Sequence, residues 1–276
     1  MPLLKLSRAN IHYERSGQGP AVLLIQGVGA GGGGWKPQVD HLSRCFEVVT
    51  YDNRGFGRSP FDKKSFTIED LAEDARELMD SVGWERAHVV GHSMGGLIAQ
   101  QLAVSHPGRV KSLSLLCTFS KGAEATRLTW PILVMGLQTR IGTKAMRRAA
   151  MLRMVLSKKG LASGDLTETA RLYGEMMGRD LADSPPVILK QMGAMSRHDL
   201  SSSLAALAKI PTLVMSASED PIAEPDFGRA LAEAIPGARF VEIPETSHAV
   251  IIERPELVNP ILEEHLRKAE NQRLAT

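Results

Sequence analysis

The chain has 276 residues, of which 43% are hydrophobic and 23% are charged, and its formal net charge is +2. This composition is typical of one large soluble globular domain, or of one domain with an insertion. The small charge argues against a general nucleic-acid-binding protein, and no run of 18 apolar residues suggests a membrane span. The start of the chain has no signal-peptide pattern, and Cys45 and Cys117 form no C-x-x-C motif. We therefore expect a cytoplasmic protein with two buried thiols.

The first part of the chain alternates predicted strands and helices. Residues 3–15 show the alternation of a β-hairpin. Strands are then predicted at 21–26, 46–51, 87–91 and 110–116. Helices are predicted at 35–42, 67–82 and 97–105. The second of these helices has one apolar stripe, Thr67 as its N-cap and Asp70 as a capping-box partner.

This alternation stops for about ninety residues and then resumes near the C-terminus. The later predicted elements are a strand at 212–216, a helix at 225–235, a strand at 239–243 and a helix at 255–268. Strand–helix alternation predicts an α/β fold with a mostly parallel sheet covered by helices on both faces. The interruption is too long for a loop in a compact domain. We expect residues 1–118 and 209–276 to form the core and residues 119–208 to form a helical insertion.

A glycine-rich segment, IQGVGAGGGGW at residues 25–35, follows the first buried strand. Gly27, Gly29 and Gly32 match the G-x-G-x-x-G pattern of dinucleotide-binding loops, and Asp52 lies where a ribose-binding acid would be expected. The same glycines would equally suit an oxyanion hole, in which backbone N–H groups stabilise a negative charge during acyl transfer. The rest of the chain must decide between the two.

Residues 91–95 read G-H-S-M-G between a predicted strand and a predicted helix. In that context G-x-S-x-G predicts a nucleophile elbow, with Ser93 on a strained turn at a helix N-terminus. A glycine-rich tight turn without catalytic function is the alternative reading.

A serine nucleophile needs a base, and the base needs an acid to orient it. His248 follows the strand at 239–243 and precedes the last helix, which is where this arrangement places the histidine. Asp220 follows the strand at 212–216 and is the candidate acid. Glu219 is its rival, and an N-cap role is the alternative for either residue.

With these pieces in place, the chain resembles the α/β-hydrolase superfamily along nearly its whole length. The matching segments are QGVGAGGGGW (26–35), YDNRGFGRS (51–59), GHSMGG (91–96), SASEDP (216–221) and ETSHAV (245–250). The resemblance implies that the backbone N–H groups of Val28 and Met94 form the oxyanion hole, and it explains Asp52 without a ribose. Two departures stand out. Gln26 replaces the usual histidine before the glycine loop, and Ala217 replaces the usual glycine of the acid loop.

By the same resemblance, the insertion at 119–208 would be a cap over the active site. It is rich in methionine, and four of its residues are candidates for lining a substrate pocket: Met135, Met154, Met177 and His198. Ordinary core filling is an equally good reading for the methionines, and a surface position for the histidine. Residues 140–160 hold seven Lys or Arg residues and no acid. We expect a solvated basic face there rather than membrane contact.

The sequence therefore predicts a serine hydrolase that cleaves small-molecule carboxylic esters through an acyl-enzyme, with Ser93, His248 and Asp220 as its triad. Enol-lactone hydrolysis, C–C bond hydrolysis and cofactor-free perhydrolysis on the same triad remain open alternatives. A ligand-binding member without turnover and a dinucleotide-binding protein are alternatives of other classes. No metal or other cofactor is expected, and the oligomeric state is not encoded in any motif.

Overall fold

The computed structural model describes residues 3–62, 64–125 and 130–274. Its centre is a seven-stranded sheet of order β3-β5-β4-β6-β7-β8-β9, in which β3 runs antiparallel to β5 and all the other neighbours are parallel. A small hairpin of β1 and β2 precedes the sheet. The strands are β1 Leu4–Lys5, β2 Asn10–Ile11, β3 Tyr13–Ser16, β4 Ala21–Ile25, β5 Glu47–Tyr51, β6 Ala87–His92, β7 Val110–Leu116, β8 Thr212–Ala217 and β9 Arg239–Ile243. The predicted α/β fold is confirmed.

The central strands are buried along their whole length, as the continuous apolar run of β4 predicts for that strand. Every residue of β4, β6 and β8 is buried. A parallel strand with helices above and below has no solvent-facing side, which explains the absence of a polar alternation in these segments.

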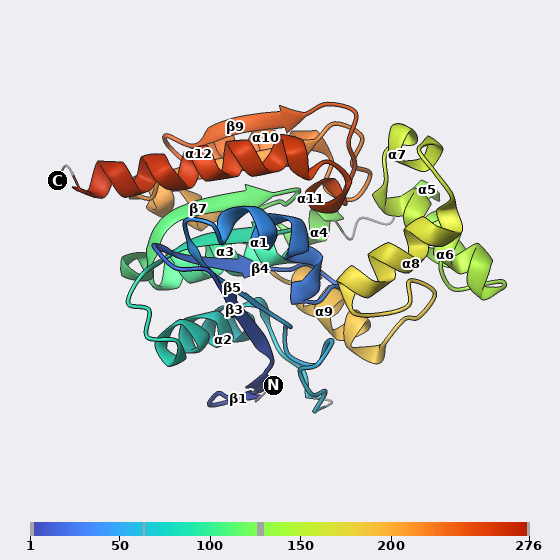
Figure 1. The fold of residues 1–276 in the computed structure, drawn as a ribbon, viewed down its shortest axis with the longest axis horizontal. Helices are drawn as coiled ribbons and strands as arrows, with labels where there is room; N and C mark the ends of the chain where they lie inside the picture. The colour runs from blue at the N-terminus through green and yellow to red at the C-terminus, as the bar shows by residue number, and fades with distance from the viewer. Residues whose placement is uncertain (1–2, 63, 126–129, 275–276) are drawn as a thin grey trace.

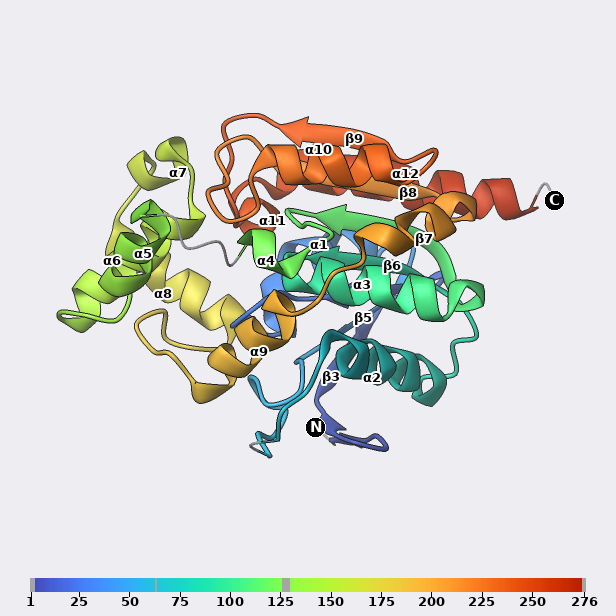
Figure 2. The ribbon, with the colours of Figure 1, turned by 180° about the vertical axis from the view of Figure 1, so that it is seen from behind.

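Helices cover both faces of the sheet. Figure 1 shows α1 and α12 on the face toward the viewer, and Figure 2 shows α3 and α10 on the opposite face. The helices of the core are α1 Lys36–Leu42, α2 Ile68–Ser81, α3 Met94–Ser105, α10 Pro225–Ala234, α11 Val250–Glu253 and α12 Pro255–Leu274, with a 3₁₀ turn, η1, at Gly32–Trp35 and another, η2, at Pro107–Arg109. The capping box of α2 is present, since the Thr67 hydroxyl accepts from the Asp70 N–H at 3.2 Å and the Asp70 carboxylate accepts from the Thr67 N–H at 3.0 Å.

Two helix boundaries differ clearly from the sequence expectation: α12 continues to Leu274 and does not end at residue 268, and α3 begins at Met94 and not at residue 97. Gly95 and Gly96 are poor helix formers, which hides the helix start from a propensity argument. Their role is close packing. A Cβ on Gly95 would lie 2.1 Å from the Ile25 carbonyl oxygen, and one on Gly96 would lie 2.4 Å from the Thr118 hydroxyl.

The described residues between β7 and β8 form helices and connecting loops, with one isolated bridge between Lys121 and Asp199. Its elements are α4 Gly122–Ala125, α5 Trp130–Gln138, α6 Lys144–Val155, α7 Lys158–Ala162, α8 Leu166–Met177, α9 Pro186–Ser196 and the 3₁₀ segment η3 Ser201–Lys209. Helices α5 to α8 gather beyond the ends toward which the arrows of β7 and β9 point (Figure 1). We call residues 119–208 the insertion. Among the described helices, none is long and apolar enough to cross a membrane.

Candidate active site

Ser93 lies in the tight turn between β6 and α3, with φ 55° and ψ −124°. This conformation is costly for a residue with a side chain, and such strain is commonly found at functional sites. The turn closes because Gly91 has no side chain: a Cβ there would lie 2.2 Å from the Gly95 carbonyl oxygen. The hydroxyl is thereby placed at the N-terminus of α3, where free N–H groups favour a negative charge.

Three non-glycine residues of the described chain have a positive φ, and they lie just beyond different strands of the sheet. Ser93 follows β6, Cys117 follows β7 at φ 46°, and Glu245 follows β9 at φ 54°. Backbone strain therefore collects at the carboxyl edge of the parallel sheet, which is the usual location of ligand sites in such folds.

Asp220 and His248 come together although they are 28 positions apart. The distance from His248 Nδ1 to Asp220 Oδ2 is 2.7 Å, and both residues are buried. The other carboxylate oxygen of Asp220 accepts from the backbone N–H groups of Ile222 and Ala223, at 2.8 and 2.9 Å. Glu219 points elsewhere, with its carboxylate accepting from the Lys158 N–H at 3.0 Å. Of the two candidate acids, Asp220 is the one that contacts the histidine.

The candidate reacting atoms of Ser93 and His248 are uncommitted. Within the described part of the chain, neither Ser93 Oγ nor His248 Nε2 takes part in a side-chain hydrogen bond. The Ser93 backbone is fixed nonetheless, since its N–H donates to Leu116 and its carbonyl accepts from the Thr118 hydroxyl at 2.7 Å. Catalytic hydrogen bonds are often formed only once substrate is bound, so this arrangement leaves both atoms available for one.

His92 contacts the backbone of His248, an interaction that no motif in the sequence predicted. Its Nε2 lies 2.8 Å from the His248 carbonyl oxygen, and the two rings are 4.9 Å apart between centroids. Burial, together with the nearby His248, lowers the pKa of His92 to about 3. His92 is therefore neutral, and Nε2 must carry the proton that it donates to the carbonyl.

Cys117 lies beside this pair, and its sulfur, one ring nitrogen of His92 and one ring nitrogen of His248 all lie within 4.8 Å of one another. Burial and the charge of Asp220 raise the pKa of the Cys117 thiol well above its usual value, so the thiolate that a metal would need is disfavoured. One nitrogen of each histidine is also engaged, by Asp220 and by the His248 carbonyl. The chemistry of this group suits proton transfer better than metal coordination.

The glycine-rich loop approaches the nucleophile directly. A Cβ on Gly27 would lie 2.8 Å from Ser93 Cβ and 3.3 Å from its hydroxyl oxygen, so only glycine fits there. Among the described residues, the N–H groups of the next residue, Val28, and of Met94 at the start of α3 have no hydrogen-bond acceptor. Two free backbone donors therefore flank the elbow, as an oxyanion hole requires.

The insertion holds the part of this loop that follows Val28. The Gly29 N–H donates to Gln191 Oε1 of α9 at 2.9 Å, and the Gly29 carbonyl accepts from Arg179 Nε at 2.8 Å. The Gly31 N–H donates to the Met177 carbonyl at 3.0 Å. The insertion therefore forms hydrogen bonds with three consecutive peptide groups of the loop, those that join residues 28–29, 29–30 and 30–31.

Arg179 is a mostly buried cation whose described hydrogen-bond acceptors are all backbone carbonyls. Burial lowers the pKa of its guanidinium. Because no carboxylate touches it among the described residues, its positive charge remains effective near the glycine loop. Sequence reasoning had no signal for Arg179 or Gln191, since neither lies in a motif.

The insertion also holds the loop that carries the histidine. The N–H of Ala249, directly after His248, donates to the Val155 carbonyl at 2.8 Å. The N–H of Ser157, at the start of α7, donates to the Glu253 carboxylate at 3.1 Å, and that carboxylate also accepts from the Ser247 N–H at 3.2 Å. The insertion thus contacts both loops that flank Ser93.

Asp52 has a structural role. One carboxylate oxygen accepts from the Gly32 N–H at 2.7 Å and the other from the Arg58 N–H at 2.9 Å. The carboxylate therefore joins the glycine loop to the turn at 52–59 and is not free to bind a ribose. The glycine run continues into η1 and a buried Trp35, whereas a dinucleotide fingerprint opens a helix directly. The oxyanion-hole reading fits this loop better.

The four residues predicted to line a pocket have different surroundings. The side chain of Met135 lies outside the described part of the structure. Met154 and Met177 are partly buried against a second apolar cluster, which the insertion shares with Ala249. His198 is buried, and its Nδ1 lies 3.2 Å from a Glu69 carboxylate oxygen on α2. His198 therefore anchors the insertion to the core.

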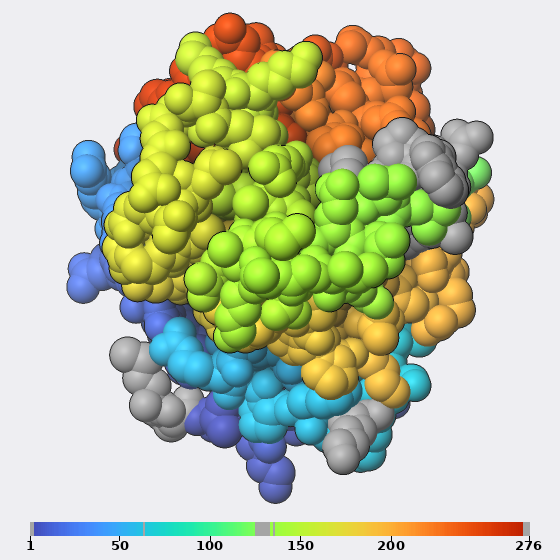
Figure 3. All heavy atoms as spheres, turned by 90° about the vertical axis from the view of Figure 1, so that its right-hand side faces the viewer, coloured from blue at the N-terminus to red at the C-terminus, as the bar shows by residue number. Residues whose placement is uncertain are grey.

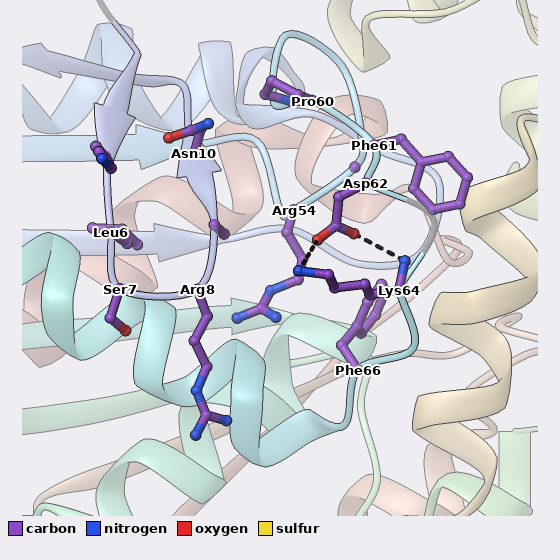
Figure 4. A pocket seen from close by; sticks show the side chains of 13 residues that line it. Leu6, Ser7, Arg8, Asn10, Arg54, Pro60, Phe61, Asp62, Lys64 and Phe66 are labelled. Atoms are coloured by element: carbon purple, nitrogen blue, oxygen red, sulfur yellow. Dashed lines mark hydrogen bonds and ion pairs between the residues drawn. The ribbon is translucent and has the colours of Figure 1, made fainter.

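A separate hollow of about 260 Å³ lies beside the β1–β2 hairpin and does not include Ser93, Asp220 or His248. Figure 4 shows Asp62 on its wall, where the carboxylate pairs with Lys64. Arg54 is bound by Asp74 at 2.6 Å, and the neighbouring Arg8 by Asp70 at 2.8 Å. With Arg54 and Arg8 neutralised in this way, this hollow is a poor candidate for the active site.

Comparison with known proteins agrees with this geometry. A family model described as the alpha/beta hydrolase fold matches residues 20–255. The chain therefore belongs to the alpha/beta hydrolase family, and it is a hydrolase.

Two similar relatives carry the same name, "Putative carbamate hydrolase RutD". The protein from Azorhizobium caulinodans is 30% identical over 264 residues, covering 95% of this chain and 97% of that protein. The protein from Yersinia enterocolitica is 30% identical over 265 residues, covering 93% and 92%.

Two solved structures are also similar. The enol-lactonase from Burkholderia xenovorans has a TM-score of 0.81 and 28% identity, covering 96% of this chain and 100% of that chain. A thermophilic esterase from Thermogutta terrifontis has a TM-score of 0.79 and 28% identity, covering 95% and 94%.

Proposed function

We propose that this protein is a serine esterase that hydrolyses small-molecule carboxylic esters through an acyl-enzyme, with Ser93 as nucleophile, His248 as base and Asp220 as the orienting acid. The observation that carries the proposal is the 2.7 Å contact between His248 Nδ1 and Asp220 Oδ2, at the same edge of the sheet as the strained Ser93. A buried carboxylate on Nδ1 fixes the imidazole in the tautomer whose Nε2 can accept a proton.

The reaction follows from these placements. His248 Nε2 takes the proton of Ser93 Oγ as that oxygen bonds to the ester carbonyl carbon. The carbonyl π electrons move to the oxygen, and this oxyanion is stabilised by the N–H groups of Val28 and Met94. As the tetrahedral intermediate collapses, the C–O bond to the alcohol breaks and His248 protonates the leaving alkoxide.

Water then releases the acid. His248 removes a proton from a water molecule, whose oxygen attacks the acyl carbon and forms a second tetrahedral oxyanion in the same hole. The bond to Ser93 Oγ breaks, and the serine recovers its proton from His248. Each turnover consumes one water molecule and yields one carboxylic acid and one alcohol.

We further propose that residues 119–208 act as a cap that shapes the substrate pocket. The hydrogen bonds from the insertion to the loops on both sides of Ser93 support this role. A cap bound in this way restricts access of water and of large substrates to the buried nucleophile.

Carbamate hydrolysis is the second candidate, and the names of the relatives from Azorhizobium caulinodans and Yersinia enterocolitica favour it. A carbamate carbonyl is open to the same attack by Ser93. Lactones are a further candidate substrate class, because the similar structure from Burkholderia xenovorans is an enol-lactonase. The three classes share the triad and differ in what the pocket accepts.

A fluorophosphonate probe and a substrate panel test the proposal. The probe should add to Ser93, as located by peptide mass spectrometry, and Ser93→Ala should remain unlabelled. Short-chain p-nitrophenyl esters should be turned over by the wild type and not by the variant. Equal turnover by Ser93→Ala would refute the mechanism. A carbamate or lactone with the higher kcat/KM in the same panel would instead replace ester as the substrate class.

A further inference from the structure

Apolar side chains that face solvent are concentrated on one part of the insertion. In the described part of the chain, nine large apolar side chains are strongly exposed, and eight of them lie in the insertion. Five of these lie on α5, on α6 or on the short turn between them: Leu133, Val134, Leu137, Ile141 and Met146. We call these five residues the α5–α6 patch. Its helices occupy the centre of the molecular face seen in Figure 3.

Such a cluster is unusual on a protein surface that contacts only water. Leu137, Ile141 and Met146 are each about 60% exposed, at 58%, 59% and 60%. They also line a hollow of about 650 Å³ between α5 and α6, together with Arg153. The patch is therefore both exposed and concave enough to accept an alkyl chain.

The surroundings of the patch are strongly basic. Residues 125–164 contain eight Lys or Arg residues and no Asp or Glu. Arg148 and Lys144 of α6 form ion pairs with Asp180, at 2.6 and 3.7 Å. Arg140, Arg147 and Arg153 form no ion pair with any described residue, so their charges remain available to a partner.

We propose that the α5–α6 patch docks this protein onto an anionic phospholipid surface. The apolar side chains enter the acyl-chain boundary of the bilayer, and the three unpaired arginines contact lipid phosphates. The sequence alone favoured a solvated basic face whose charge is balanced by acids elsewhere. The structure changes that balance, since it turns these apolar residues outward.

The charge pattern favours a membrane over the other partners that an apolar patch could have. A symmetric dimer through this patch would bring each arginine near its own copy, and like charges facing each other disfavour association. A nucleic acid would pair with the cations but would leave the apolar centre of the patch against water. An anionic bilayer satisfies both components.

Vesicle sedimentation with purified full-length protein tests the proposal. The wild type should sediment with vesicles of phosphatidylglycerol and phosphatidylcholine and should bind pure phosphatidylcholine far less. About 0.5 M salt should release it from the anionic vesicles, because salt screens the attraction between the arginines and the lipid phosphates. Leu137→Ser with Ile141→Ser should abolish binding. Arg140→Gln with Arg153→Gln should weaken it about 25-fold, on the basis of about fivefold per cation.

Leu189→Ser with Arg197→Gln is the matched control, because Leu189 on α9 and Arg197 directly after α9 are both exposed and neither lines the hollow. This control should bind vesicles as the wild type does. All three double variants change exposed residues, so they should fold, and circular dichroism should verify this. Ester turnover in solution, with no vesicles present, should be the same for all of them.

Three results would overturn the proposal. The first is equal binding to neutral and anionic vesicles, or none to either. The second is an equal loss of binding in the α9 control. The third is a wild-type dimer in light scattering that Leu137→Ser with Ile141→Ser converts to a monomer, which would assign the patch to a second copy of the chain.

Discussion

The Gly29 N–H donates a hydrogen bond to Gln191 Oε1 at 2.9 Å, although the two residues are 162 positions apart. This bond connects the proposed oxyanion loop to α9 of the insertion. The carbonyl oxygen of Gly29 accepts a hydrogen bond from Arg179 Nε. The insertion therefore contributes to the geometry of the loop next to Ser93.

Gln191→Met tests this connection, because methionine fills a similar volume but cannot accept from Gly29. The loop should relax, and kcat should fall by about 10- to 100-fold with little change in KM, since a small misplacement near the reacting atoms is costly. Steady-state kinetics with a p-nitrophenyl ester measures both constants. Met192→Gln, an exposed change one residue further on, is the control and should behave as the wild type. Unchanged kcat in Gln191→Met would contradict a positioning role.

Asp220→Asn should reduce kcat by about 10⁴, because an amide on Nδ1 favours the wrong histidine tautomer. Glu219→Gln is the matched comparison. Its carboxylate accepts from the Lys158 N–H and does not reach His248. Stopped-flow or steady-state assays should therefore show near-normal turnover for Glu219→Gln. A large loss in that variant, with a small one in Asp220→Asn, would reverse the assignment of the acid.

Gly27→Ala should abolish most activity while the protein still folds. The added methyl group would lie 2.8 Å from Ser93 Cβ, so either the serine or the oxyanion loop must move. One misplaced oxyanion donor costs about 10²–10³ in kcat. Gly108→Ala is the control, because nothing lies within 4 Å of a Cβ there. Full activity in Gly27→Ala would show that the loop does not approach the serine in the working enzyme.

Buried histidines should make the folded state sensitive to acid. Burial lowers the pKa of His88 and of His265 to about 4, from an ordinary value of 6.5. Between these values the unfolded chain binds protons that the folded protein does not. The free energy of unfolding should therefore fall as the pH drops from about 6.5 to 4, by up to about 1.4 kcal/mol per pH unit for each histidine.

Urea unfolding at several pH values measures this slope. His88→Gln removes one such group, so its slope should be shallower than that of the wild type by up to about 1.4 kcal/mol per pH unit. The comparison of slopes remains valid even if the variant is less stable at every pH. Parallel slopes would mean that His88 is protonated in the folded protein.

The sheet and the elbow were predictable because their signals are local. The strands predicted at 21–26, 87–91 and 212–216 correspond to β4, β6 and β8, and each of these is wholly buried. G-x-S-x-G marked Ser93 because the elbow needs glycine at fixed offsets, where Gly91 and Gly95 are in close contact. The order of Asp220 and His248 after successive strands was enough to bring them together, since parallel strands end at one edge of the sheet.

The contacts of the insertion were not predictable from any local pattern. Gln191, Arg179 and His92 look like ordinary polar residues in the sequence, and their partners are backbone groups of distant loops. Methionine content suggested a pocket but did not distinguish it from core filling, and Met154 and Met177 pack in the second apolar cluster. Side-chain type alone does not say which face of a helix will be covered.

The hydrogen bonds that join the insertion to the Gly29 and Ala249 loops also limit how this protein can be re-engineered. Transplanting a foreign cap between β7 and β8 is an obvious way to change substrate preference. A chimera made in this way would lose the acceptors that Gln191 and Val155 provide, unless the donor segment supplies equivalent groups at the same places. Grafts that preserve these two junctions should keep turnover while the pocket is exchanged.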